Sequence, residues 1–465
     1  MKKRIYAAAI LPALFFFASC GEDRTYEFEQ KTRESQWIYN VMKQWYLWYD
    51  ELPSMNDYKQ FFSAPETFFK KILSKKDKYS YFEADRSQTR SIDLYSSYGF
   101  DFALYVDPVT QSQSAPDRYA RVLYVLPNSP ASEAGLKRGD WITAVGGKQI
   151  TEKNYVELMN GAATTLTLQK LGYNSQQDDI WWEEEATTLP LSASRKVEDN
   201  PFYVDTLYRI GGHRIAYLFY NRFTTGPDDT GNEQEYGNQM RQIFNRFKAD
   251  EPTDFILDLR YNPGGYLSCA QELASLLAPE SAMGKVFYSL KFNDKMTDRN
   301  QTKLFERSLT GGGNLNLSRL YIIVSHVTAS ASESIINGLR PLMGDDNIVL
   351  VGTTTEGKNV ASLTFKSDYG FTIHPIVATV YNSLGQSDYA NGFVPTYEMN
   401  ELVYVNEFKP LGDVEELLLG TTLGIILKEN ADDATRASSL RYPLRPLEAT
   451  GTSIRPAQAE LELSE

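Results

Sequence analysis

Apolar residues recur at helical spacing near the beginning of the chain. Within residues 26–84, the large side chains that recur three or four positions apart include Trp37, Val41, Trp45 and Trp48. This spacing predicts a small helical domain with an aromatic core, in preference to an aromatic ligand-binding site.

Shorter apolar runs of strand-like character follow between residues 90 and 172. These runs are residues 98–105, 118–125, 141–145 and 165–169. Between them, Ser129 with Pro130 forms a good helix start and Gly135 a good helix end. The pattern predicts a β-rich domain that contains a short helix.

Strand and helix patterns alternate from residue 200 to residue 428. Strands are predicted at residues 214–220, 255–259, 320–325 and 348–351, and helices at residues 233–247, 267–277 and 330–342. Such alternation is typical of a mainly parallel sheet in a layered α/β domain. Residues 371–381 predict a longer β segment that follows a turn at 367–370.

The chain is therefore predicted to be a multidomain α+β protein, as its 465 residues also suggest. The expected parts are a leader (1–19), a helical domain (20–88), a β-rich domain (89–175), an α/β domain (176–428) and a tail (429–465). The tail has few apolar residues and no periodicity, so we expect it to be disordered.

Composition and charge exclude several classes of function. Lys plus Arg number 47 against 60 for Asp plus Glu, so the formal net charge is −13, and no basic stripe offsets it. Because such a surface repels phosphate backbones, we expect no nucleic-acid partner. The two cysteines and three histidines form no metal-binding cluster in the sequence, and we expect neither a metal nor a cofactor.

The first twenty residues have the pattern of an export signal. A positively charged start precedes a mostly apolar stretch at residues 5–19, which is too short to span a bilayer comfortably. Small residues then precede Cys20, which resembles the bacterial lipobox and implies acylation of that cysteine. We expect a lipid-anchored envelope protein of the outer membrane, on either face; the alternative is a plain secretory signal. Cys269 would then be a free, buried thiol.

A long motif in the β-rich domain runs from residue 126 to residue 147 and reads LPNSPASEAGLKRGDWITAVGG. It resembles the motif of PDZ domains, which bind a free C-terminus as an added strand and hold its carboxylate with backbone N–H groups. The resemblance implies a carboxylate loop formed by Tyr98, Gly99, Phe100, Asp101 and Phe102. A glycine is expected there because a residue without Cβ lets the backbone close around an anion.

Two segments of the α/β domain place polar groups at helix starts. Residues 258–267 run from a strand through a Pro-Gly-Gly turn into a helix, which suits an oxyanion but also suits a purely structural turn. Residues 327–333 place Ser330 at the start of the next helix. Its hydroxyl is either an activated nucleophile or, with Glu333 three residues later, part of a capping box.

A third segment, residues 352–359, has the GxxxxGK spacing that also occurs in phosphate-binding loops. A nucleotide site is disfavoured because Asn359 replaces the Mg²⁺-binding hydroxyl and residues 360–365 predict a strand rather than a helix. Lys358 lies on a loop after a buried strand. It is either a solvated loop lysine, the commoner case, or a buried lysine whose pKa falls from about 10.4 so that the amine acts as a base.

None of the three histidines is well placed as a base for Ser330. His213 lies at a strand start and His374 within a β run. His326 is four residues before Ser330, but no carboxylate is placed to orient it.

The order of these segments resembles that of the C-terminal processing (tail-specific) peptidases of the S41 class. DLRYNPGG, TASASE and GK follow the PDZ-like motif, and the resemblance extends to about residue 395. It implies that Ser330 is the nucleophile and Lys358 the general base of a Ser-Lys dyad. It also implies that the backbone N–H of Ala331, with that of Gly264 or Gly265, forms an oxyanion hole.

One position departs from this pattern. Many relatives have Gln four residues after the lysine, where this chain has Ser362, which becomes the candidate for orienting the lysine. The expected function is a serine endopeptidase that cleaves envelope or extracellular proteins near their C-termini, with the tails presented by the PDZ domain. The alternative is a catalytically weak or inactive lipid-anchored PDZ scaffold that binds C-termini without turnover. The oligomeric state is not predicted.

Overall fold

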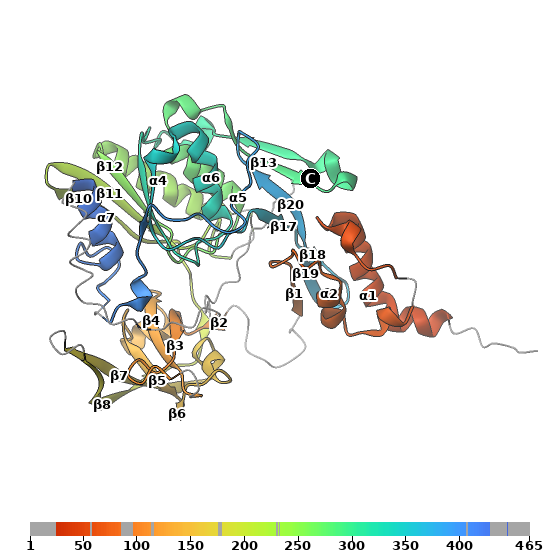
Figure 1. Cartoon of the computed structure of the whole chain (residues 1–465), viewed down its shortest axis with the longest axis horizontal. Coiled ribbons are helices and arrows are strands. Elements are labelled where there is room, and N and C mark those ends of the chain that lie inside the picture. The colour runs from red at the N-terminus through yellow and green to blue at the C-terminus, as the bar shows by residue number, and fades with distance from the viewer. Residues whose placement is uncertain are drawn as a thin grey trace, which may run out of the picture.

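The computed structural model describes residues 25–55, 58–84, 96–112, 116–174, 179–228, 231, 233–405, 408–427 and 444. The expected leader, Cys20 and nearly all of the expected disordered tail lie outside these residues. Leu444 is buried, and its N–H donates to the carbonyl of Val403 at 3.0 Å, so this residue of the tail packs on the core. Figure 1 shows three parts: an N-terminal unit, a β-rich domain and an α/β core.

The N-terminal unit contains α1 (Thr25–Trp45) and α2 (Pro65–Ile72), with the 3-10 turns η1 (Tyr49–Glu51) and η2 (Tyr58–Phe62) between them. Its buried core consists of Ile38, Met42, Tyr46, Phe68, Phe69 and Ile72 together with Phe371 and Ile373 from the far end of the chain. The predicted helical unit with an aromatic core is confirmed, but Trp37, Val41 and Trp48 lie only partly buried around this core, and Trp45 packs against the α/β core instead.

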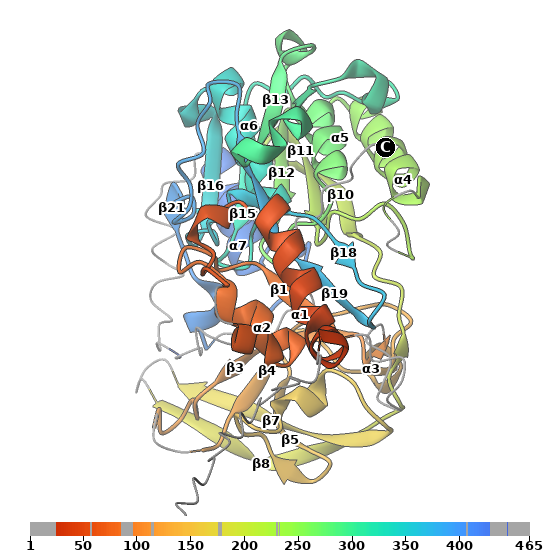
Figure 2. The same cartoon turned by 90° about the vertical axis from the view of Figure 1, so that its right-hand side faces the viewer.

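The N-terminal unit also contains a strand that the sequence pattern did not predict. Strand β1 (Tyr81–Ala84) pairs antiparallel with β19 (Phe371–His374), which pairs in turn with β18 (Phe365–Lys366). The unit therefore shares a three-stranded sheet with the C-terminal half of the chain, as Figure 2 shows.

The β-rich domain is a sheet of strand order β3-β4-β5-β7-β8, with β3 at one edge. Its strands are β3 (Phe100–Tyr105), β4 (Tyr119–Val125), β5 (Trp141–Val145), β6 (Lys148–Gln149), β7 (Thr164–Asn174) and β8 (Asp179–Leu191), beside α3 (Pro130–Ala134) and η4 (Tyr155–Leu158). The sheet extends to residue 191, beyond the predicted boundary at 175. The prediction missed β8 because most of its residues are exposed and three consecutive acids, Glu183, Glu184 and Glu185, interrupt its apolar pattern.

The α/β core is built on a six-stranded sheet of order β10-β11-β12-β15-β16-β21. The strands are β10 (Phe202–Ile210), β11 (His213–Tyr220), β12 (Asp254–Asp258), β15 (Leu320–Val324), β16 (Ile348–Gly352) and β21 (Tyr397–Glu398). Only the β10–β11 pair is antiparallel, so the predicted mainly parallel sheet is confirmed.

The two faces of this sheet are covered by different elements. Helices α4 (Glu235–Ala249), α5 (Leu267–Leu277) and α6 (Ala331–Met343) pack on one face, and α7 (Leu417–Leu427) and the β-rich domain lie toward the other (Figure 1). Alternate residues of β11 divide between the faces: Ala216 and Leu218 pack on the first, Tyr217 and Phe219 on the second. The sheet is thus the middle layer that the strand and helix alternation predicted.

A second sheet lies beside α6 and has the order β14-β13-β20-β17. It consists of β14 (Gln301–Leu304), β13 (Val286–Phe292), β20 (Ile376–Tyr381) and β17 (Val360–Ser362). The β segment predicted at 371–381 is interrupted at Pro375, so β19 and β20 belong to different sheets. The turn predicted at 367–370 is confirmed, since it joins β18 to β19.

Candidate active site

Ser330 lies at the start of α6 in a backbone conformation that few residues with a side chain adopt. Its φ is 58° and its ψ is −111°, outside the common left-handed region. Such a conformation costs free energy and persists only where the surroundings impose it, which is frequent at active sites. The side chain is almost completely buried, with 2% of its surface exposed.

Hydrogen bonds to the neighbouring strand end fix the turn before Ser330. The hydroxyl of Thr328 donates to the carbonyl of Leu259 at 2.8 Å, and the N–H of Ala329 donates to the carbonyl of Asn262 at 3.2 Å. The hydroxyl of Ser332 donates to the same Asn262 carbonyl at 3.1 Å. The turn that follows β15 is therefore held against the glycine turn that follows β12.

Glu333 connects the serine to the lysine loop. Its carboxylate accepts four hydrogen bonds, from the N–H groups of Ser330 (2.8 Å), Lys358 (2.8 Å) and Gly357 (2.7 Å) and from the hydroxyl of Thr355 (2.6 Å). Burial raises the pKa of Glu333 to about 7, and the four hydrogen bonds oppose this rise. The sequence indicated Glu333 only as a capping residue. One carboxylate in fact fixes the backbone at both ends of the candidate dyad.

Lys358 is buried on the loop between β16 and β17. Only 1% of the residue is exposed, and its Nζ lies 5.4 Å from the centre of the Tyr79 ring. The loop needs a glycine at position 357. Gly357 has a φ of +93°, which residues with a side chain rarely adopt, and a Cβ there would lie only 2.6 Å from the Ala390 carbonyl oxygen. Ser362, four residues after the lysine, is also buried and ends β17.

The glycine turn lies against the serine. A Cβ on Gly264 would come within 2.9 Å of the Ser330 Cβ, and one on Gly265 within 1.9 Å of the Phe223 carbonyl oxygen. The N–H of Gly264 donates to the side-chain oxygen of Asn262 at 2.9 Å, so this donor is already engaged. Ala331 is the first residue of α6, and its N–H therefore has no acceptor within the helix.

The histidines lie in other settings. His213 pairs with Asp254 at 2.7 Å near the beginning of β12, at the opposite end of the sheet from Ser330. His374 is held by Thr364 at 3.0 Å and Glu83 at 3.2 Å, and His326 is exposed.

The predicted carboxylate loop of the β-rich domain lies at the start of edge strand β3. The N–H of Tyr98 donates to the Met159 carbonyl at 3.2 Å, and that of Gly99 to the Ser97 hydroxyl at 3.1 Å. A Cβ on Gly99 would lie 2.1 Å from the Ser129 Cβ. In this structure, Gly99 is thus required for close packing against the helix start, a different reason from the one expected.

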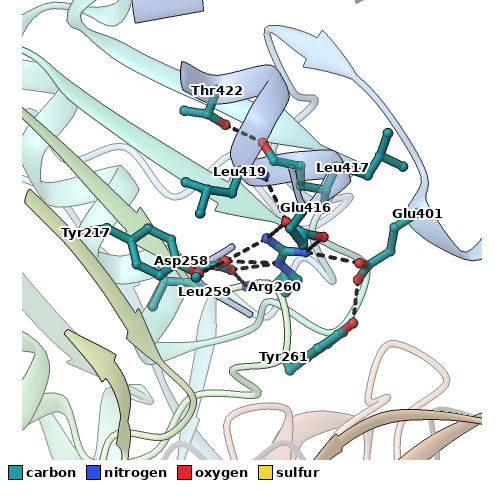
Figure 3. A network of polar contacts seen from close by, with 12 residues as sticks. Tyr217, Asp258, Leu259, Arg260, Tyr261, Glu401, Glu416, Leu417, Leu419 and Thr422 are labelled. Atoms are coloured by element: carbon teal, nitrogen blue, oxygen red, sulfur yellow. Dashed lines mark hydrogen bonds and ion pairs between the residues drawn. The ribbon is translucent and has the colours of Figure 1, made fainter. Parts of the chain in front are cut away.

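A buried ionic cluster surrounds Arg260, on the segment that leads into the glycine turn (Figure 3). Arg260, with no exposed surface, binds the carboxylates of Asp258 (2.7 Å), Glu401 (3.0 Å) and Glu416 (2.7 Å). The Tyr217 hydroxyl donates to Asp258 at 2.8 Å. The pKa values of two acids in this cluster shift in opposite directions. Burial raises the pKa of Asp258. Burial also acts on Glu401, but the charges of two arginines lower its pKa to about 2.

The second arginine of this cluster comes from the β-rich domain. Arg138 donates to Glu401 at 2.7 Å, to the Tyr261 hydroxyl at 2.8 Å and to the Lys409 carbonyl at 3.0 Å. Tyr261 in turn donates to Glu401 at 2.5 Å. The cluster therefore joins the β-rich domain to the segment that leads into the glycine turn.

Metal-binding clusters and membrane-spanning helices are both absent from the part of the chain that the structure describes. There, no three acidic, histidine or cysteine side chains gather closely enough to hold a metal ion. Within the same residues, no helix has the length and apolar character needed to cross a membrane.

Family models match three regions of the chain. They are the PDZ domain at residues 121–170, the peptidase S41 N-terminal domain at residues 33–81, and peptidase family S41 at residues 214–399. They fall within the β-rich domain, the N-terminal unit and the α/β core, respectively.

Individual relatives agree with these matches. A solved S41 protease from Bacteroides fragilis is 36% identical, with a TM-score of 0.73 over 85% of this chain and 97% of its own. The carboxyl-terminal-processing protease of a Picosynechococcus species is 25% identical over 59% of each chain. The carboxy-terminal processing protease of Bacillus subtilis is 24% identical over 70% of this chain and 61% of its own. The matched part is thus under two thirds of the length of each of these two processing proteases.

Proposed function

This chain belongs to peptidase family S41, and we propose that it is a serine endopeptidase with Ser330 as nucleophile and Lys358 as general base. The main support is the shared carboxylate of Glu333, which accepts hydrogen bonds from the N–H groups of both residues at 2.8 Å. Two residues far apart in sequence are thereby fixed to one side chain, as a dyad requires.

The proposed reaction begins with proton transfer. Burial of Lys358 removes the water that stabilises its ammonium form, which favours the neutral amine as the base. The amine takes the proton of the Ser330 hydroxyl while the serine oxygen attacks a peptide carbonyl carbon. The resulting ammonium then gives a proton to the leaving amine, and water hydrolyses the acyl-enzyme.

The tetrahedral oxyanion needs donors that are not already used. The N–H of Ala331 satisfies this requirement because it begins α6. Since the N–H of Gly264 is bonded to the side chain of Asn262, the geometry favours the N–H of Gly265 as the second donor. The absence of a side chain on Gly264 lets the glycine turn lie close to Ser330. Such donors commonly supply a large part of transition-state stabilisation. Ser362 is proposed to orient the lysine from β17.

The substrates are proposed to be proteins with unstructured C-termini. A PDZ domain recognises such tails by adding them to a sheet edge, and β3 is an edge strand here. In the proposal, residues 98–102 hold the tail carboxylate. Because Tyr98 and Gly99 already donate their N–H groups within the domain, a tail carboxylate could accept from these two groups only after the loop rearranges.

We test the activity with the full chain purified in detergent and a protein bearing an unstructured apolar C-terminus, with products identified by mass spectrometry. We expect cleavage by the wild type and none by Ser330→Ala or Lys358→Ala. Lys358→Arg should also be inactive, because a guanidinium does not deprotonate at working pH. Lys366→Arg, at an exposed lysine of β18, is the matched control. Tail binding without cleavage by the wild type would favour the scaffold alternative.

Membrane attachment is proposed to occur through acylated Cys20, with the protein in the outer membrane of the cell envelope. The support is the export-signal pattern at residues 1–19 followed by the cysteine. Mass spectrometry of the N-terminal peptide should find acyl groups on Cys20, and Cys20→Ala should release the protein from the membrane fraction. An unmodified cysteine would contradict the anchor.

A further inference from the structure

Tyr79 belongs to the N-terminal unit but lies beside the amine of Lys358, with 5.4 Å between the ring centre and Nζ. Its backbone is held from within its own unit by Asp77. One carboxylate oxygen of Asp77 accepts the N–H groups of Tyr79 and Ser80, each at 2.9 Å, and the other accepts the Tyr46 hydroxyl at 2.7 Å. The turn that presents the ring is therefore fixed by side-chain bonds.

The α/β core holds the same turn from the other side. The N–H of Ile376 donates to the Ser80 hydroxyl at 2.9 Å, and Tyr81, the first residue of β1, pairs with His374 of β19. The rings of Tyr81 and His374 also stack, with centroids 4.0 Å apart. Because the turn is bonded on both sides, the position of the Tyr79 ring relative to the lysine is a built feature of the fold.

We propose that Tyr79 is a positioning residue of the dyad, whose ring face stabilises the ammonium that Lys358 becomes when it takes the proton of Ser330. The faces of aromatic rings attract cations within about 6 Å of their centres, and the attraction is stronger where water is excluded. The neutral amine gains little from the ring, so the stabilisation appears as the positive charge develops. The catalytic part of this inference rests on the proposed function.

The other titratable groups around the lysine are acids and tyrosines. Glu333 of α6 binds the lysine N–H, and Glu356 lies two residues before the lysine. The Tyr79 hydroxyl is buried and lies near the carboxylate of Glu356. Burial, with the charges of Glu356 and Glu333, raises the pKa of Tyr79, and burial likewise raises that of Tyr389. Both tyrosines therefore stay neutral, and Tyr79 acts through its ring.

The test is an NMR titration of the full chain with ¹³C-labelled lysines, in which the Lys358 signal is assigned from Lys358→Met. In Tyr79→Leu the Lys358 pKa should fall by about half a unit to one unit, the shift that corresponds to loss of a cation–ring contact. Tyr79→Phe keeps the ring and should return the titration toward that of the wild type. Tyr369→Leu is the matched control, because it removes a contact between an aromatic ring and Arg33 at 5.1 Å.

A second replacement preserves the shape of the side chain. Trifluorophenylalanine at position 79 withdraws electron density from the ring face, so Lys358 should titrate below its value in Tyr79→Phe. The acidic limb of the kcat/KM profile should move with the lysine titration. A lysine titration that is unchanged in Tyr79→Leu and with the fluorinated ring would overturn the proposal, as would Tyr79→Phe behaving like Tyr79→Leu. Because the NMR readout needs no turnover, a chain that cleaves nothing but shows these shifts would refute only the proposed peptidase.

Discussion

Arg138 and Glu401 form an ion pair of 2.7 Å whose side chains are 7% and 6% exposed, and this pair joins the PDZ domain to the peptidase core. The pair belongs to the same cluster as Arg260, two residues before Asn262 in the glycine turn. The docking of one domain and the geometry of the other's active site thus depend on a common set of buried charges.

Replacing Arg138 should destabilise the protein strongly. Arg138→Met leaves Glu401 and Glu416 with one arginine instead of two, and breaking a buried pair in this way typically costs about 3–5 kcal/mol. Denaturant unfolding, followed by the fluorescence of the tryptophans, measures the loss. Arg195→Met is the control, because its pair with Glu133 is exposed and should contribute about 1 kcal/mol or less. Equal effects of the two replacements would contradict the role given to the cluster.

Replacing Glu333 should reduce activity by more than its effect on stability would explain. Glu333→Gln puts an amide nitrogen where a carboxylate oxygen accepts two hydrogen bonds, so a pair of donors loses its acceptor. An unsatisfied buried donor costs about 1–3 kcal/mol, and a small displacement of a catalytic group can cost about a hundredfold in rate. Single-turnover rates of the folded variant should fall by about that factor. Glu398→Gln, on an exposed residue of β21, should leave the rate unchanged.

Glu333 should also make stability depend on pH. Because burial raises its pKa from 4.5 to about 7, the folded protein holds a proton that the unfolded chain releases between these values. The contribution of Glu333 to the free energy of unfolding is at its maximum below about pH 4.5. It decreases by about 3 kcal/mol as the pH rises from there through 7. Urea unfolding at several pH values should show this fall in the wild type. If the free energy of unfolding of Glu333→Gln depends on pH in the same way, the dependence belongs to another group.

Adding one methyl group at Gly264 should damage the site. The Cβ of Gly264→Ala would lie 2.9 Å from the Ser330 Cβ and 3.0 Å from the Ala329 carbonyl oxygen, so the serine turn must move. We expect kcat to fall at least tenfold because the serine turn is displaced. The variant should also lose stability, since an alanine is strained at a φ of +107°. Gly284→Ala separates the two effects, since Gly284 has a φ of +81° but open space around it. If both variants keep wild-type kcat, Gly264 has no part in shaping the site.

The sequence predicted the fold class and the layers of the core, because these depend on local patterns of apolar residues. Local patterns also placed Ser330 at a helix start and Lys358 on a loop after a buried strand, but only the resemblance to S41 peptidases singled them out as a dyad. The sequence did not predict the ionic cluster. Glu401 and Glu416 lie far along the chain from Arg260 and Arg138, and nothing local distinguishes them from surface acids. Their burial follows only from the way in which α7 and the β-rich domain pack on one face of the sheet.

Two other features escaped prediction for physical reasons. Strand β8 has most of its residues exposed, and the acidic run Glu183, Glu184 and Glu185 at its middle resembles a linker more than a strand. Tyr79 is a half-buried aromatic residue in a turn, and its spatial neighbour Lys358 lies far from it in the sequence. Contacts between distant segments leave no periodic signal in either segment.

The pairing of β1 with β19 has a consequence for how the chain matures. Residues 81–84 are made early in synthesis, but their partner strand, residues 371–374, emerges only after nearly three hundred further residues. The N-terminal unit is therefore among the last parts of the fold to be completed, and such long-range pairing is slow. Tyr79 reaches the lysine only when that sheet closes, so the complete set of groups around the dyad forms after almost the whole core has been synthesised. A protease assembled in this order has an incomplete site while its own unfolded segments are most open to cleavage.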